Sequence, residues 1–420
     1  MLLKNVVAIP VSVPGTRPRS LAEGLAPARP CPLGSPANPD FRHRATRMES
    51  DRSEPGQPRV IFHIGAEKTG TTSFQRFCLE NRAELLGRGW LYPTASFAFG
   101  KMSRNHAPLV AAYLTGAVTP DYSVAKVWRT REETLGSLFA EIEGAAAHSV
   151  LLSAEHFSSR FGAHQINQLS LDFARFRPKI VIVFRSHLEW MYSLYSTSVR
   201  NGSRLRYDEL VRHLLPSSGL IVAYRLIVEQ WAQAFGEHNL SLLHLREGED
   251  VTELLTRAGI LPVLREAYTG YRDNAGNDPR VIEVLRRTNE IIETRARRAA
   301  SSYFQHRLTD LARTKIVERL NAISRTDRDQ ATFLMCADPI LQRSLEGAIA
   351  QDEDWLRRNF GLDLAPVCAS RARPAPTSAE IEASSNRLMK QLGFWGRGWL
   401  RVALFARGGA LAPAESNTAP

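Results

Sequence analysis

The residues best suited to chemistry form the stretch Gly65–Ser73, with the sequence Gly-Ala-Glu-Lys-Thr-Gly-Thr-Thr-Ser. A short apolar run, Val60–Ile64, precedes it and predicts a buried strand. After it, Phe74, Phe77 and Cys78 recur with the spacing of a helix that has one apolar face. A helix that begins at a glycine turn offers unpaired backbone N–H groups and the positive end of its dipole there. The stretch therefore predicts a loop that binds a phosphate or sulfate group.

Side chains in this loop can add to the anion site. Lys68 supplies a cation, and hydroxyl donors come from Thr71, Thr72 and Ser73. The loop differs from the phosphate loop of nucleotide triphosphatases, G-x-x-x-x-G-K-[ST], because Thr71 stands where the lysine should follow the second glycine. An ordinary strand–helix turn with a surface lysine is the simplest alternative.

A second candidate lies after the β-branched run Lys179–Phe184, which predicts a strand buried on both faces. Arg185 follows the carboxyl end of that strand, and Ser193 lies on the helix predicted after it. The planar guanidinium of arginine suits a phosphate dianion, because it donates two parallel hydrogen bonds. An arginine that only caps the edge of the sheet is the alternative.

Three further polar residues are candidates for acid–base chemistry. Glu155 and His156 follow directly after the predicted strand Ser149–Ser153. Ligands of open α/β sheets bind outside the carboxyl ends of the strands, so both residues are well placed to act. His106 precedes a predicted helix and could also face the site, although capping that helix would explain it equally well. His187 is interpreted as a local packing residue.

Predicted strands and helices follow one another along the chain, as in open α/β folds. Residues 1–55 are rich in proline and arginine and predict a disordered tail. Residues 56–363 are expected to form one domain, with helical insertions and C-terminal helices at about 280–360. Residues 364–420 are read as a linker and a short apolar tail that could dock on the body or contact a membrane surface.

Composition places limits on the class of protein. The 420 residues include 54 basic and 43 acidic ones, and the net charge of +11 suits an anionic ligand. The sequence has neither a zinc-finger spacing nor a basic stretch interleaved with aromatic residues. It therefore gives little indication of nucleic-acid binding. The four cysteines are scattered without a C-x-x-C pair, which favours a reducing compartment such as the cytoplasm and gives no structural zinc site. No apolar run is long enough to predict a membrane span.

The order Gly65–Ser73, then Arg185 and Ser193, each after a strand, resembles the bacterial sulfotransferases of the carbohydrate-modifying type. These enzymes use 3′-phosphoadenosine 5′-phosphosulfate (PAPS). The resemblance covers roughly residues 58–360 and implies a P-loop-like, three-layer fold with a central parallel sheet flanked by helices, plus a helical C-terminal part. It implies transfer of a sulfuryl group, without a metal, from PAPS to a hydroxyl or amine acceptor such as a carbohydrate.

The resemblance also implies roles for individual residues. The 5′-phosphosulfate would be held by Lys68, Thr69, Gly70, Thr71, Thr72 and Ser73, and the 3′-phosphate by Arg185 and Ser193. Lys68 would neutralise charge on the leaving 5′-phosphate, and Glu155, His156 or His106 would accept the proton of the acceptor. Two alternatives stay open: a P-loop-type phosphotransferase or kinase, and a non-catalytic module that binds polysaccharide.

Overall fold

The computed structural model describes residues 57–66, 68–97, 105–114, 130–215, 223–246, 248–264, 278–295, 303–324, 334–364, 376–381, 385, 398–399 and 402–403. The predicted tail, residues 1–55, lies outside the described residues, as does most of the predicted linker and C-terminal segment.

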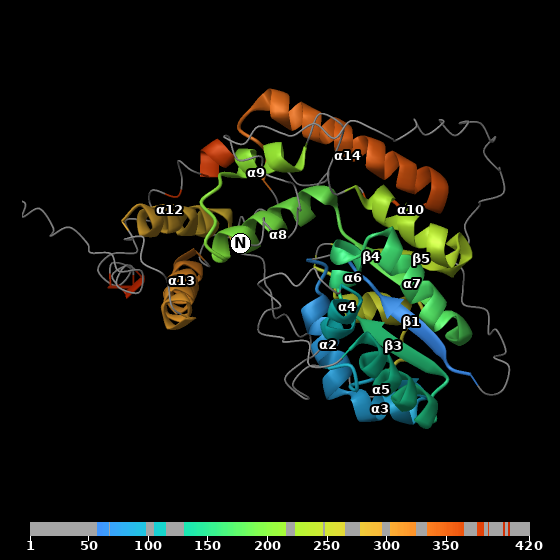
Figure 1. The fold of residues 1–420 in the computed structure, drawn as a ribbon. Helices are drawn as coiled ribbons and strands as arrows, with labels where there is room; N and C mark the ends of the chain where they lie inside the picture. The colour runs from blue at the N-terminus through green and yellow to red at the C-terminus, as the bar shows by residue number, and fades with distance from the viewer. Residues whose placement is uncertain are drawn as a thin grey trace, which may run out of the picture.

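The centre of the fold is a sheet of five strands in the order β2-β3-β1-β4-β5 (Figure 1). The strands are β1 (Arg59–His63), β2 (Trp90–Leu91), β3 (Ser149–Ser153), β4 (Lys179–Phe184) and β5 (Leu240–His244). Every pairing between them is parallel. The expected α/β class with a central parallel sheet is thus confirmed.

Helices cover both faces of the sheet, because alternate residues of the central strands point to opposite sides. Ile61, Leu151 and Val183 join one core with α2 (Thr71–Glu80), α3 (Arg82–Gly87) and α11 (Val251–Arg257). Phe62 and Leu152 face a second, larger core. On that face pack α4 (Ala107–Tyr113), α5 (Arg131–Gly144), α6 (His156–Arg160), α7 (Ala163–Phe173) and α10 (Tyr224–Phe235). The result is a three-layer arrangement, as the apolar strands require.

A helical part continues from the carboxyl end of β4. It contains α8 (His187–Arg200), α9 (Tyr207–Leu214), α12 (Pro279–Arg295), α13 (Tyr303–Ser324) and α14 (Pro339–Phe360). Helix α8 runs away from the sheet and packs against α12, which packs against α13 (Figure 1). Helix α14 packs against α9 and α10, so it joins the helical part to the sheet domain. Within the predicted C-terminal tail, Ala403 packs with Ile292 and Ala312 on the body.

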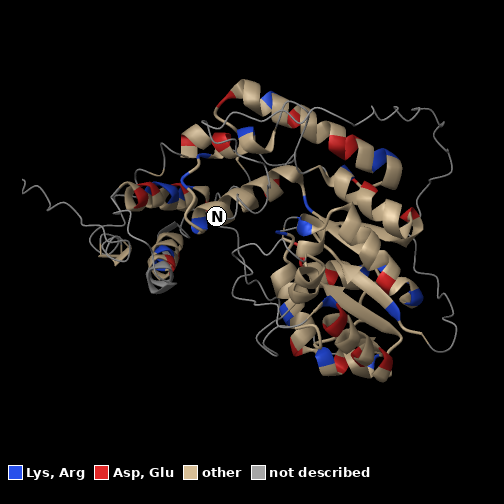
Figure 2. Cartoon of the chain, viewed as in Figure 1, with Lys and Arg blue, Asp and Glu red and all other residues tan. Residues whose placement is uncertain are grey.

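Charges on the helical part are interleaved rather than gathered. Basic and acidic residues are mixed along α12 (Figure 2). Arg286 is buried and pairs with Glu283 and Glu290, and Arg287 also pairs with Glu283. Arg286 and Arg287 are therefore engaged in ion pairs within their own helix. Among the described helices, none is both long and apolar enough to cross a membrane.

The order of the strands contains one topological switch point. From β1 the chain leads towards β2 on one side, and from the adjacent β4 it leads to β5 on the other side. In parallel sheets, ligands bind outside the carboxyl ends of the strands where the chain direction switches in this way. The two predicted anion motifs follow β1 and β4, the strands that flank this switch point.

Candidate functional site

The predicted anion loop leaves β1 and runs along the end of β4. Backbone N–H groups of Ile64 and Ala66 donate to the carbonyls of Val181 and Val183, each at 3.0 Å. The loop then turns sharply, because Lys68 has φ 72° and Gly70 has φ 76°. The left-handed region is free for glycine but costs a lysine of order 1–2 kcal/mol. A strained lysine therefore lies at the tip of the loop.

Hydrogen bonds inside the loop hold this turn. Thr69 Oγ1 is fully buried and donates to the carbonyl of Ala66 at 2.7 Å. Ser158 on α6 donates to the carbonyl of Gly65 at 3.2 Å. A Cβ on Gly65 would stand only 2.9 Å from Thr69 Oγ1, so glycine is required there for close approach. The hydroxyl of Thr69, expected from the resemblance to hold a ligand, is instead turned inwards.

Helix α2 begins at Thr71 with its N-terminus open. The first helical hydrogen bond joins Phe74 N–H to Gly70 O at 3.3 Å, so the amides before Phe74 have no acceptor within the helix. No side chain caps this end, and no acidic residue lies in its first turn. Gly70 and Thr72 are exposed, whereas Ser73 is buried. The exposed groups that can meet an anion are therefore the backbone at Gly70 and the hydroxyl of Thr72.

Arg185 brings the second motif to this loop. It follows β4 directly, and its Nη1 donates to the carbonyl of Lys68 at 3.3 Å. The two motifs, 117 positions apart in the sequence, thus lie in contact. The Nε and Nη2 groups of Arg185 both donate to Oε2 of Glu189, at 3.2 and 3.1 Å. The side chain of Glu189 is only 4% exposed, so part of the arginine fork is already used by a buried carboxylate.

Ser193 shares a helix face with this ion pair. It is half-buried on α8, four residues after Glu189, which itself comes four residues after Arg185. Residues four apart are neighbours on a helix surface. Glu189 therefore lies between Arg185, which it binds, and Ser193, one helical turn further along α8.

Glu155 reaches the anion loop from the neighbouring strand. It lies between β3 and α6, and its Oε2 accepts a hydrogen bond from the hydroxyl of Thr71. His156, the first residue of α6, is half-buried. Of the acid–base candidates, the carboxylate of Glu155 is thus placed at the N-terminus of α2, where an anion would bind.

His106 occupies a different environment. It is fully buried, its Nδ1 accepts from the backbone N–H of Ser153 at 3.0 Å, and its Nε2 donates to the carbonyl of Pro93 at 3.0 Å. Burial lowers the pKa of His106 to about 4, although its two backbone hydrogen bonds work against that shift. Since both ring nitrogens are bonded to the backbone, the structure assigns His106 to holding the loop before α4 against β3.

Helix α14 supports the start of α8. His187 is buried and bonds Asp352 at 2.9 Å and Glu353 at 3.1 Å. Asp352 also accepts from the backbone N–H groups of Tyr224 and Arg225 at the start of α10, at 2.9 and 3.0 Å. Burial alone would lower the pKa of His187, but the hydrogen bonds to the two carboxylates raise it above its ordinary value. The packing role predicted for His187 therefore agrees with its burial, and the two carboxylates add an ionic link between α8 and α14.

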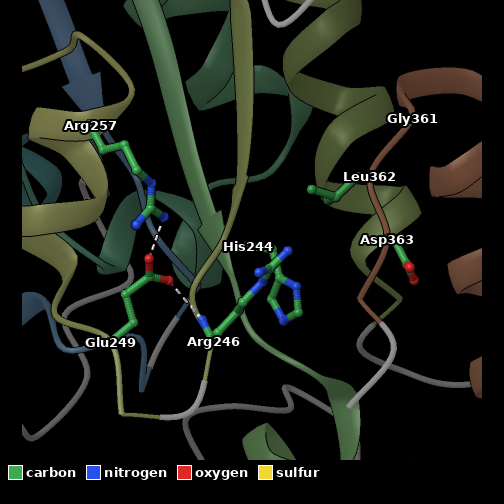
Figure 3. Close-up of a pocket in the computed structure, with 7 residues that line it drawn as sticks. All are labelled: His244, Arg246, Glu249, Arg257, Gly361, Leu362 and Asp363. Carbon is green, nitrogen blue, oxygen red and sulfur yellow. Dashed lines mark hydrogen bonds and ion pairs between the residues drawn. The ribbon is translucent and has the colours of Figure 1, made fainter. Parts of the chain in front are cut away.

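A cavity of about 420 Å³ opens at the carboxyl end of β5 (Figure 3). His244 and Arg246 come from the strand end, Glu249 and Arg257 from the turn and helix that follow, and Gly361–Asp363 from the end of α14. Burial and the charge of Arg246 lower the pKa of His244. Glu249 pairs with Arg257 and accepts from Arg246 N–H.

The anion loop lies close to the start of α11, two residues after Glu249 of the cavity. A Cβ on Gly70 would stand 3.8 Å from Cγ1 of Val251, the first residue of that helix. The cavity and the loop are therefore neighbours along the same edge of the sheet.

Sequence reasoning missed two residues of this edge. His63, the last residue of β1, is fully buried with its Nε2 close beneath the loop. Glu189 binds the predicted phosphate ligand Arg185. The spacing of Glu189, four residues after Arg185, could have indicated that ion pair. His63 gave a weaker signal, a lone polar residue at the end of an apolar strand.

Comparison with models of known protein families finds no match, and neither curated proteins nor solved structures show a significant similarity to this chain. Function must therefore be argued from the site. The site consists of the N-terminus of α2, Lys68 at the tip of the loop and Arg185, with the carboxylate of Glu155 beside the loop. Within the described ranges, no group of three or more His, Cys, Asp or Glu side chains is arranged to hold a metal ion.

Proposed function

We propose that this protein is a PAPS-dependent sulfotransferase with a P-loop-like nucleotide site. The observation that carries the proposal is the contact between Arg185 and the carbonyl of Lys68, which joins the two predicted anion motifs at the switch point of the sheet. Two anion sites in contact suit a ligand with two phosphate groups, such as PAPS with its 5′-phosphosulfate and 3′-phosphate.

The 5′-phosphosulfate belongs at the open N-terminus of α2. There the backbone from Gly70 onwards, the Thr72 hydroxyl and the Lys68 ammonium would meet it. The 3′-phosphate belongs at Arg185 and Ser193. The cavity at the end of β5 is adjacent and large enough to take part of a nucleoside.

The reaction is an in-line displacement at sulfur. An oxygen of the acceptor attacks the sulfur atom, its proton passes to a base, and the bond between sulfur and the bridging oxygen of the 5′-phosphate breaks. Lys68 stabilises the charge that develops on that oxygen. Glu155 is the preferred base because its carboxylate already lies at the anion loop, next to Thr71. His156 is kept as the second candidate, and His106 is set aside because both its nitrogens are occupied.

A carbohydrate or another hydroxyl-bearing compound is proposed as the acceptor, on the strength of the family resemblance. The buried free thiols of Cys78 and Cys336 agree with the expected reducing compartment, for which we propose the cytoplasm.

Calorimetric titration tests the class of enzyme. Wild-type protein is titrated with 3′-phosphoadenosine 5′-phosphate without metal, and in parallel with ATP and magnesium. Arg185→Ala should lose affinity for the bisphosphate. Arg88→Ala is the matched control, because Arg88 forms a similar i,i+4 pair with Glu84 on the surface. Binding of ATP with magnesium, without any affinity for the bisphosphate, would replace this proposal with a kinase.

A further inference from the structure

His63 is a buried imidazole directly beneath the anion loop. It is the last residue of β1 and is fully buried. Its ring packs edge-on against the ring of Phe74 on α2, with 4.8 Å between the ring centroids. Its Nδ1 lies 2.9 Å from the hydroxyl oxygen of Ser153, and its Nε2 has no hydrogen-bond partner. A buried polar atom without a partner is uncommon and calls for an explanation.

A chain of side-chain hydrogen bonds leads to Nδ1 of His63. Asn105 donates to the side-chain oxygen of Gln75 at 3.3 Å, and the side-chain nitrogen of Gln75 donates to Ser153 Oγ at 3.3 Å. Ser153 Oγ therefore has its own hydrogen left for the adjacent imidazole. We assign the neutral ring the tautomer in which Ser153 donates this hydrogen to His63 Nδ1 and the proton is on Nε2.

The charge state is consistent with this tautomer. Burial lowers the pKa of His63 to about 3, so the ring is neutral at physiological pH. Around the ring, the facing polar groups from α2 and β3, Gln75 and Ser153, are uncharged. His63 thus presents a neutral N–H donor from Nε2.

That N–H faces the inside of the loop. A Cβ on Gly65 would stand 3.2 Å from His63 Nε2 and 2.9 Å from Thr69 Oγ1, so both atoms border the same small space above Gly65. Thr69 Oγ1 gives its hydrogen to the carbonyl of Ala66. Its lone pairs are consequently available to accept a hydrogen bond from the His63 side.

We propose that His63 is a positioning residue of the anion loop, whose Nε2–H donates to Thr69 Oγ1 when an anion is bound. Thr69 lies between Lys68 and Gly70, the two residues with left-handed backbone. Fixing Thr69 from beneath therefore holds Lys68 in its strained conformation against the ligand. This inference rests on the anion loop of the proposed function and adds the residue that supports it.

Nitrogen NMR of histidine-labelled wild-type protein tests the tautomer without any mutation, and the missing signal in His63→Gln provides the assignment. His63 should show a protonated Nε2 and an unprotonated Nδ1, without titration between pH 8 and 5. Its Nε2 proton should shift when 3′-phosphoadenosine 5′-phosphate is added. A proton on Nδ1, titration near pH 6.5, or a proton signal indifferent to the ligand would each overturn the inference.

Ligand affinity gives the second measurement. His63→Leu should weaken bisphosphate binding about tenfold, as expected for one lost hydrogen bond. His63→Gln, which can return an N–H to the Nε2 position, should stay within about threefold of wild type. The control His164→Gln, at an exposed position on α7, should bind like wild type. Equal losses in His63→Leu and His63→Gln would contradict a donor role.

Two further experiments cover the cases in which a variant does not fold or the wild type does not bind the bisphosphate. If His63→Leu does not fold, Ser153→Ala replaces it: removing the hydroxyl should let the Nδ1-protonated tautomer appear and weaken binding. If wild-type protein does not bind the bisphosphate at all, the sulfotransferase proposal fails on its own. The same NMR titration with inorganic sulfate then decides the inference, since a shifted Nε2 proton supports it and an unchanged one overturns it.

Discussion

Lys68 combines two properties that are rarely found together in a non-glycine residue. Its backbone has φ 72°, and it carries a positive charge three residues before the first residue of α2. Strain of this kind persists only where surrounding contacts enforce it. Here the carbonyl of Lys68 is held by Arg185, and the next residue, Thr69, is tied to Ala66. Substitutions at Lys68 and its neighbours therefore test these contacts directly.

Two substitutions of Lys68 separate the backbone from the side chain. Lys68→Ala and Lys68→Gly should both abolish sulfuryl transfer, because each removes the ammonium. Lys68→Gly should be more stable than Lys68→Ala by about 1 kcal/mol, because glycine accepts the left-handed conformation. Denaturant unfolding of the two variants measures the difference, and equal stabilities would show that the turn is not strained. Retained turnover in Lys68→Ala would favour another role for the loop.

Gly65→Ala should damage the loop without touching any proposed ligand contact. The new Cβ would meet Thr69 Oγ1 at 2.9 Å, and that hydroxyl is fixed by its bond to Ala66. We expect a loss of stability of about 1–3 kcal/mol and at least a tenfold loss of bisphosphate affinity. Gly136→Ala is the control, because Gly136 lies in α5 with open space around it and the change should stabilise by about 0.5–1 kcal/mol. Unchanged bisphosphate affinity in Gly65→Ala would show that the loop tolerates the extra methyl group.

Glu189→Gln should improve binding of the bisphosphate. The Glu189 carboxylate accepts hydrogen bonds from two N–H groups of Arg185, and it would repel a 3′-phosphate placed there. Neutralising it should tighten the bisphosphate about fivefold and leave adenosine 5′-phosphate unchanged. Glu229→Gln, in the exposed pair with Arg225, is the control. Weaker bisphosphate binding in Glu189→Gln would mean that the carboxylate is needed to orient Arg185.

At the scale of elements, apolar runs were sufficient to predict the strands. β3 and β4 have the predicted bounds, Ser149–Ser153 and Lys179–Phe184, because their buried, branched residues have no other favourable environment. Parallel pairing then brings Arg185 to the anion loop, since both follow carboxyl ends of adjacent strands. The direction of individual side chains could not be predicted. The inward hydroxyl of Thr69 and the backbone bonds of His106 depend on neighbours 3 to 47 positions away.

Asp352 should be important although it lies outside the proposed site. It receives hydrogen bonds from His187 at the start of α8 and from two amides at the start of α10. Removing one partner of a buried ionic link costs about 3–5 kcal/mol, so Asp352→Ala should destabilise by that order and weaken bisphosphate binding. Asp354→Ala, on the same helix, should cost under about 0.5 kcal/mol, because Asp354 pairs with solvent-accessible arginines. Denaturant unfolding and titration measure both, and a neutral Asp352→Ala would disprove the link.

At the scale of the whole molecule, two buried histidines reduce the stability of the fold at acid pH. Burial lowers the pKa of His63 to about 3 and that of His106 to about 4, so the unfolded chain binds more protons than the folded one below pH 6.5. Their contribution is complete above pH 6.5 and is lost as the pH falls towards 4. His187 acts in the opposite direction, because its raised pKa stabilises the fold at low pH.

We expect stability to fall by about 2 kcal/mol for each of His63 and His106 between pH 6.5 and 5, partly offset by His187. Unfolding by denaturant at a series of pH values measures this slope. His63→Gln should reduce it, since glutamine does not titrate. A slope that is unchanged in His63→Gln would show that His63 is not held neutral by the fold.

We propose that the loop after β1 and Arg185 after β4 bind the two phosphates of one nucleotide. Calorimetry with trimmed ligands tests it most directly, by titrating wild type and Arg185→Ala with 3′-phosphoadenosine 5′-phosphate and with adenosine 5′-phosphate. We predict that wild type prefers the bisphosphate by at least about tenfold and that Arg185→Ala binds the two ligands alike. Equal loss of affinity for both ligands in Arg185→Ala would contradict this proposal. Arg185 would then stabilise the loop without binding the 3′-phosphate.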